Sequence, residues 1–194
     1  MTAPPSTAPS GYDRTSRLLH WLVAAAFLGA LGLGLALGNL ELAREARAVL
    51  LDPHKALGLV VLAFGTWRVA RRLRRSFPAP AAPGPRWREA AAKAVHGALL
   101  AAILVMPLSG VAMTLARGRA LEVAGVTLLP AIGETPWLAA AAGTAHALAG
   151  PLVLGLLALH VGAALKHHFV DRDATLLRMT TGVRTRRGRA AGSA

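Results

Sequence analysis

The residues of this chain best suited to bind a metal are its histidines. The 194 residues include seven His and no Cys, which excludes disulfides, zinc–thiolate sites, iron–sulfur clusters and covalent CxxCH haem attachment. Five of the seven lie within or beside long apolar segments, namely His20, His54, His96, His146 and His160. An ionisable side chain inside an apolar span is costly to bury, so such residues usually serve a function.

His146 and His160 share the longest apolar segment, and their spacing is informative. Fourteen residues of α-helix make four turns less about 40°, so both imidazoles lie on one face, roughly 21 Å apart along the axis. His20 can then meet His160 at one level, and His54 can meet His146 at the other. Two His from facing helices of a bundle can hold a six-coordinate b-type haem. The pattern therefore predicts two haem b groups with these four His as axial ligands of the iron.

Other readings of the same residues stay open. His96 lies at the level of His20, and it either competes with His20 as a ligand or lines the haem edge. Any single His could instead be an interfacial residue or a hydrogen bonder between helices, and His167 and His168 could form a solvated helix end. Glycines that could leave room for a flat macrocycle, or serve ordinary helix packing, are Gly29, Gly32, Gly34, Gly58, Gly143 and Gly150.

Four apolar segments must position these side chains. Residues 18–40 and 94–116 each run for 23 residues without a charge, and about 20 suffice to cross a bilayer. The second segment has a shorter apolar part, but long Arg side chains at its end can snorkel to the headgroups. The expected helices cover about 17–39, 54–75, 90–116 and 137–169. A short apolar piece at 123–132 is too short to span and is expected in the membrane interface.

These segments predict an all-α integral membrane four-helix bundle. Its domain covers residues 14–179, with a disordered N-terminus at 1–13, a Pro-rich linker at 76–88 and a basic tail at 180–194. The composition agrees, because 16% of the residues are charged and the mean hydropathy is +0.47, whereas soluble domains carry about 25% charged residues.

The net charge of +13 indicates orientation rather than nucleic-acid binding. Of the 22 Lys and Arg, 17 fall in the N-terminal segment, the link between the second and third spans, and the C-terminal segment. Cytoplasmic loops are enriched in Lys and Arg, so we expect both termini in the cytoplasm and a multi-pass protein of a bacterial inner membrane. Three cations of the opposite side could partner haem propionates near His54 and His146: Lys55, Arg117 and Arg119.

Several motifs, taken in order, resemble one known family. They are RLLHWLVA around His20, HKALG at His54, MPLSG at the end of the His96 helix, the pair His146 and His160, and KHHFVDRDATLLRM at 166–179. From about residue 12 to residue 179 the chain resembles the prokaryotic cytochrome b561 family. These are four-helix di-haem membrane cytochromes related to the cytochrome b subunits of nickel–iron hydrogenases.

The resemblance implies that His20 and His160 bind the inner haem, and that His54 and His146 bind the outer haem. Some members are similar to superoxide oxidases, which take an electron from periplasmic superoxide and reduce ubiquinone at the inner side. The same resemblance would place His167 at the quinone headgroup. It would place three basic residues near the superoxide entry: Lys55, Arg117 and Arg119.

Three functions follow from these observations. The first is a di-haem protein that oxidises superoxide and reduces ubiquinone, as a monomer or homodimer. The second is a membrane anchor that passes electrons between the quinone pool and a soluble dehydrogenase or hydrogenase partner. The third is a haem-free helical bundle that binds anionic lipid. An absorbance spectrum separates the third from the first two, because only those two predict a b-type band.

Overall fold

Four long antiparallel helices make up the protein in a computed structural model, which describes residues 11–75 and 85–182. In chain order they are α1 (Arg14–Asn39), α2 (Arg44–Leu73), α3 (Arg86–Ala116) and α4 (Pro136–Phe169). The contacts between α1 and α2 and between α3 and α4 are extensive, α2 and α3 join the two pairs, and α1 meets α4 at few positions. All four helices are long and apolar enough to cross a membrane. The predicted four-helix membrane bundle is thereby confirmed.

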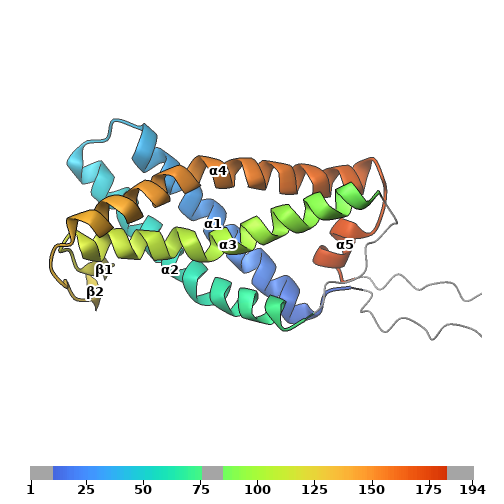
Figure 1. The fold of residues 1–194 in the computed structure, drawn as a ribbon, viewed down its shortest axis with the longest axis horizontal. Helices are drawn as coiled ribbons and strands as arrows, with labels where there is room; N and C mark the ends of the chain where they lie inside the picture. Colours follow the sequence, from blue (N-terminus) through green and yellow to red (C-terminus); the bar gives the residue numbers. More distant parts are fainter. Residues whose placement is uncertain (1–10, 76–84, 183–194) are drawn as a thin grey trace, which may run out of the picture.

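Two small elements mark the opposite ends of the bundle (Figure 1). A hairpin of β1 (Leu121–Val123) and β2 (Val126–Leu129) lies between α3 and α4, and the short helix α5 (Thr175–Thr180) follows α4. We call these the hairpin end and the α5 end. The predicted disordered start, Pro-rich linker and basic tail fall mainly on residues 1–10, 76–84 and 183–194, outside the described residues.

Helix α2 begins earlier than the sequence predicted, at Arg44 rather than near residue 54. Its first ten residues are mostly good helix formers, and Pro53 is accommodated inside the helix although it has no backbone N–H to donate. His54 therefore lies within the helix and not at its start. Helix α3 likewise begins at Arg86, directly after Pro85, so the predicted linker ends sooner than expected.

The hairpin is an element that the sequence did not predict. Ala124 and Gly125 connect its strands, and both have positive φ (51° and 76°), as a type I′ turn requires. Alanine rarely adopts this conformation, so the sequence carries no strong turn signal. The backbone N–H of Ala124 donates to Asp52 Oδ2 at 2.8 Å, which fastens the turn to α2.

The core is a band of apolar side chains halfway along the bundle. Each helix contributes to it: Val23 and Phe27 from α1, Val61 from α2, Ile103 from α3 and Val153 from α4. Many large apolar side chains point outward instead, such as Leu148 and Leu152. An outward apolar surface of this extent fits a helix bundle whose solvent is lipid. The tight central band leaves the two ends of the bundle for the histidines.

Helix α5 folds back onto the start of α1. Arg17 Nη1 donates to the carbonyl of Thr180 at 2.9 Å, and the indole Nε1 of Trp21 donates to the carbonyl of Met179 at 3.1 Å. These bonds supply donors to carbonyl groups at the end of α5 that have no partner inside the helix. The chain after α4 is thus fixed beside His20.

Candidate functional site: two histidine clusters

His54 and His146 face each other at the hairpin end, across the interior of the bundle. Their ring centroids are 6.0 Å apart and the ring planes are inclined at 85°. His54 Nδ1 lies 2.9 Å from the carbonyl oxygen of Ala30, and His146 Nδ1 lies 3.0 Å from that of Met106. A carbonyl oxygen only accepts, so each Nδ1 carries the proton. Each Nε2 then keeps a free lone pair, as a metal-binding imidazole requires.

Three imidazoles gather at the α5 end. The ring centroids of His20 and His160 are 6.3 Å apart, and those of His96 and His160 are 5.3 Å apart. These three side chains come from α1, α3 and α4. By sequence alone His96 is either a ligand or a haem-edge residue, and the structure places it beside the same His160 that faces His20.

Each of the two predicted His pairs has the separation expected if one iron atom lies between its two rings. A metal–nitrogen bond of about 2 Å and about 1.1 Å from the nitrogen to the ring centroid put two axial imidazoles roughly 6 Å apart, centroid to centroid. The separations of 6.0 Å for His54–His146 and 6.3 Å for His20–His160 match that value. The His96–His160 separation of 5.3 Å is shorter. The chemistry of the donors also fits, because neutral imidazoles are ordinary haem ligands.

Two glycines make room for the imidazoles at the hairpin end. A Cβ at Gly34 would lie 3.0 Å from His54 Cε1, and a Cβ at Gly110 would lie 3.3 Å from His146 Cε1. Gly34 was among the glycines selected from the sequence, whereas the role of Gly110 was missed. Ser109, beside it in the MPLSG motif, places its hydroxyl 3.0 Å from His146 Nδ1.

The other selected glycines divide into two groups. A Cβ at Gly29 would meet Leu57, and one at Gly143 would meet the guanidinium of Arg117. At these two positions a neighbouring side chain fills the space, which favours the helix-packing alternative. The remaining three have open space where a Cβ would stand: Gly32, Gly58 and Gly150.

One face of α4 carries a row of residues spaced by seven. His146, Val153, His160 and His167 follow one another at this interval, so each lies about 10 Å beyond the last along nearly the same face. Val153 is 2% exposed and lies in the central core. Helix α4 thus presents His146 to the hairpin end and His160 and His167 to the α5 end. The buried Val153 lies between them.

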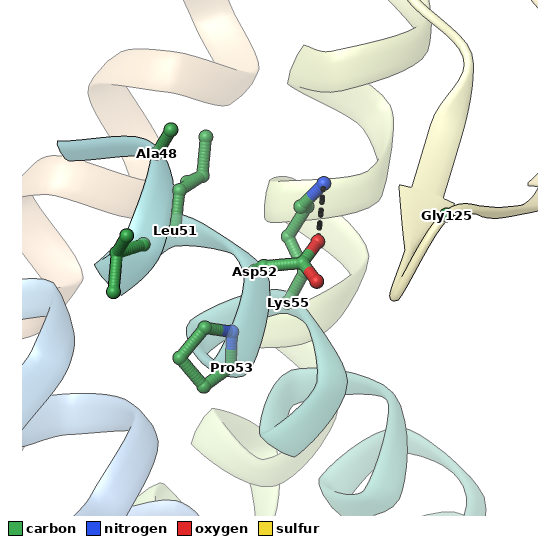
Figure 2. A pocket seen from close by; sticks show the side chains of 7 residues that line it. Ala48, Leu51, Asp52, Pro53, Lys55 and Gly125 are labelled. Carbon is green, nitrogen blue, oxygen red and sulfur yellow. Dashed lines mark ion pairs between the residues drawn. The ribbon is translucent and has the colours of Figure 1, made fainter. Parts of the chain in front are cut away.

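Two of the three predicted basic residues of the hairpin end, Lys55 and Arg117, lie against neighbouring elements. Figure 2 shows Lys55 and Asp52 of α2 beside a shallow hollow that β1–β2 borders at Gly125. Lys55 Nζ lies 3.4 Å from Asp52 Oδ1 and donates to the carbonyl of Glu122. The guanidinium of Arg117 lies beside Gly143 of α4. Lys55 is therefore tied to the hairpin, while Arg117 faces α4.

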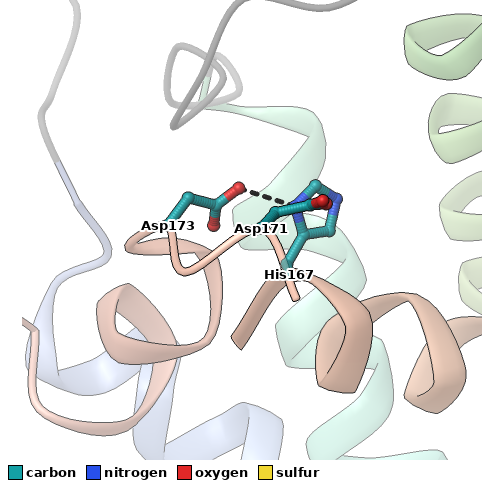
Figure 3. Close-up of side chains that lie close together, drawn as sticks. All are labelled: His167, Asp171 and Asp173. Carbon is teal, nitrogen blue, oxygen red and sulfur yellow. Dashed lines mark hydrogen bonds and ion pairs between the residues drawn. The ribbon is translucent and has the colours of Figure 1, made fainter. Parts of the chain in front are cut away.

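His167 forms a polar cluster with two aspartates just beyond α4 (Figure 3). Its Nδ1 lies 2.6 Å from Asp173 Oδ2 and 3.4 Å from Asp171 Oδ2. Lys166 Nζ binds Asp171 at 2.6 Å, so that carboxylate already has a cation. Burial raises the pKa of Asp173, but hydrogen bonds from Thr175 and His167 outweigh burial and hold this pKa below its usual value. Asp173 is thus an ionised partner that orients the His167 ring.

Arg68 is a residue whose position the sequence did not reveal. It was grouped with the Arg residues that indicate orientation, yet its guanidinium interacts electrostatically with His20, His96 and His160. Its Nη1 donates to the carbonyl of Ser16 at 3.4 Å. An intramembrane charge beside three imidazoles is a functional candidate, and a carboxylate of a bound group is the partner that a guanidinium suits best.

A membrane bundle of four helices with imidazole pairs facing across its interior defines a membrane cytochrome b. The family description "Prokaryotic cytochrome b561" matches residues 11–182, and the chain belongs to this family, whose members normally bind b-type haem. It is 30% identical to cytochrome b561 homolog 2 of Escherichia coli (strain K12), over 90% of this chain and 93% of that protein. It is 28% identical to cytochrome b561 homolog 1 of the same organism, over 87% and 96%. The chain is a membrane electron-transfer protein of this family.

Proposed function

We propose that this protein binds two haem b groups and carries electrons from superoxide at the hairpin end to ubiquinone at the α5 end. The observation that carries the proposal is the pair of imidazole separations, 6.0 Å and 6.3 Å, each of which suits one iron. His54 and His146 would hold one haem, and His20 and His160 the other. Each haem, when bound, supplies reversible one-electron chemistry and tolerates a low-polarity site.

Several residues support this assignment of the two reactions to the two ends. Carbonyl oxygens of Ala30 and Met106 set the tautomers of His54 and His146, which leaves the Nε2 lone pair of each ring available to a metal. Arg68 would balance a propionate at the α5 end. Lys55, Arg117 and Arg119 are the candidates for attracting superoxide, since a local positive field raises the on-rate of a small anion. The hairpin end carries as many acids as cations, so this attraction depends on how these three cations cluster.

Quinone reduction needs protons as well as electrons. Two superoxide anions give up one electron each and leave as two O2, and one ubiquinone takes up two electrons and two protons to become the quinol. His167 stands one heptad beyond His160 on α4, and its Nδ1 is held by Asp173 at 2.6 Å. We infer that His167 Nε2 relays a proton to the quinone headgroup, while Asp173 holds the ring in place.

The charge distribution supports one orientation of these two ends. The α5 end carries most of the Lys and Arg, and positive loops stay in the cytoplasm. The hairpin end would then face the periplasm, where superoxide enters. Both termini, His167 and the quinone site would lie at the cytoplasmic face of a bacterial inner membrane, which also supplies the protons.

A direct experiment is to generate superoxide in a pulse beside the purified, haem-loaded protein in the presence of ubiquinone. We expect superoxide to disappear faster than by spontaneous dismutation, with one quinol formed for every two superoxide anions. Loss of superoxide at the spontaneous rate would contradict the proposal. Quinol oxidation coupled only to a co-purifying dehydrogenase or hydrogenase would instead indicate a membrane anchor.

A further inference from the structure

A basic hollow lies on the outside of α2 at the α5 end, away from the histidines. It has a volume of about 470 Å³ and is lined by Trp67, Ala70, Arg71, Arg74 and Arg75. Trp67 is 50% exposed, and Arg74 and Arg75 are exposed as well. None of the redox steps above uses these side chains.

The face of α2 that carries this hollow has its apolar and its charged side chains in the order in which a phospholipid has its acyl chains and headgroup. Phe64, Trp67, Arg71 and Arg74 follow one another at helical spacing, and Phe64 and Trp67 both point outward. From Phe64 to Arg74 the helix rises about 15 Å, which equals one leaflet of a hydrocarbon core about 30 Å thick. Aromatic side chains thus lie at acyl-chain and interfacial depth, and guanidinium groups lie at headgroup depth.

The charges of the hollow are only partly neutralised inside the protein. Asp13, at the start of α1, binds Arg71 Nη2 at 3.1 Å and also pairs with Arg75. Among the described residues no carboxylate forms an ion pair with Arg74. Three guanidinium groups and one carboxylate give the hollow a net charge of about two positive units. The C-terminal end of a helix carries only about half a negative charge, so the hollow stays positive.

We infer that this hollow is a specific site for one anionic phospholipid. The phosphate would be held by Arg71 and Arg74, Trp67 would pack against the glycerol region, and the acyl chains would follow Phe64. Asp13 positions two of the guanidinium groups without cancelling the site. This site is independent of the haems and of the quinone reaction. Its ligand class follows from the aromatic residues one to two turns below the cations, which a soluble anion would not use.

The test is a lipid titration of the purified full chain, read by native mass spectrometry as the fraction of chains that retain one phospholipid. Phosphatidylglycerol is the probe, and phosphatidylcholine with identical acyl chains is its zwitterionic counterpart. We expect phosphatidylglycerol to saturate at one molecule at low concentration. Arg74→Gln should weaken its binding about fivefold, since one cation near a membrane surface contributes on that order.

A matched variant controls for the change in net charge. Arg86→Gln removes the same charge at the start of α3, at the same end of the bundle, and should leave phosphatidylglycerol binding unchanged. Equal weakening by Arg74→Gln and Arg86→Gln, or equal retention of phosphatidylcholine and phosphatidylglycerol, would overturn the inference. Full displacement of the lipid by inorganic phosphate would also overturn it, because the site would then select a soluble anion. Helical content measured by circular dichroism verifies that each variant folds.

Discussion

The two ends of the bundle hold their imidazoles in different ways. At the hairpin end two imidazoles are each fixed by a backbone carbonyl, and a glycine stands behind each ring. At the α5 end three imidazoles share the space around His160, and Arg68 lies near all three. The hairpin end therefore offers one rigid ligand pair, whereas the α5 end offers a choice of partners and an adjacent charge. This difference is what the proposed function would require, since the hairpin end would receive only electrons and the α5 end would handle electrons together with protons.

The largest effect should come from removing a ligand at the rigid end. His54→Ala leaves His146 without a facing imidazole, and the nearest described third imidazole lies at the other end of the bundle. We expect one of two haems to be lost, so that the b-type absorbance per chain falls by about half. A pyridine-haemochrome assay measures the haem content. Full haem content in His54→Ala would contradict the assignment of this pair.

The crowded α5 end should respond unevenly to the loss of its histidines. Since the His20–His160 separation matches one iron more closely than the His96–His160 separation does, His20→Ala should lose the second haem. His96→Ala should keep it and shift only its reduction potential. Spectra during a redox titration distinguish these outcomes. If His96→Ala loses the haem and His20→Ala keeps it, the ligand pair is His96 with His160.

Proton delivery should distinguish the α5 end from the hairpin end. Asp173→Asn removes the charged partner of His167 while keeping its shape, and a hydrogen bond to a charged group contributes on the order of 2 kcal/mol. We expect ubiquinone reduction to slow by at least tenfold, with haem content and haem reduction unchanged. Asp171→Asn is the control, because the 2.6 Å bond between His167 and Asp173 remains. An equal loss in both variants would argue for a purely structural cluster.

A smaller effect should come from tightening the space behind a ring. Gly34→Ala would bring a methyl group to 3.0 Å from His54 Cε1, so the imidazole must move by a few tenths of an ångström. We expect weaker haem retention at the hairpin end, measured by transfer of haem to apomyoglobin. Gly58→Ala on α2 has open space around its Cβ and should behave like the parent protein. Identical haem loss from both variants would show that the close fit at Gly34 has no role.

The smallest effect concerns the stability of the α5 end. Asp13 caps α1 by accepting from Ser16 N at 2.8 Å. Burial raises its pKa, but this hydrogen bond and the charges of Arg71 and Arg75 outweigh burial and hold the pKa below its usual value. A lowered folded-state pKa means that the stabilisation is complete above the unfolded value and disappears as the pH falls through the folded one. Asn caps a helix as well as Asp does, so Asp13→Asn removes mainly the partly exposed ion pairs with Arg71 and Arg75. It should cost about 1 kcal/mol or less near neutral pH. Thermal unfolding should show this difference shrinking as the pH falls below the usual pKa of an aspartate, about 4.

Much of the fold was readable from the sequence because lipid imposes a simple rule on it. An apolar run of about 20 residues must be helical, since every backbone polar group in a bilayer needs an internal partner. That rule predicted four spans, and the fourteen-residue spacing of His146 and His160 predicted their shared face. The start of α2 was placed ten residues late, because Pro53 and the charges before it look like a boundary by local criteria.

Only the tertiary structure decided which side chains meet. The sequence could not show that Gly110 stands behind His146, that the charge of Arg68 acts on three imidazoles, or that Asp173 holds His167. These relations join residues of different helices, or residues on either side of a turn, and they depend on how the helices are rotated and shifted relative to one another. Helix rotation is set by side-chain packing, here around Val61 and Val153, and that packing has no signature in the spacing of a single segment. Composition and periodicity thus determined the membrane bundle and its histidine levels, while packing decided the partner of each imidazole.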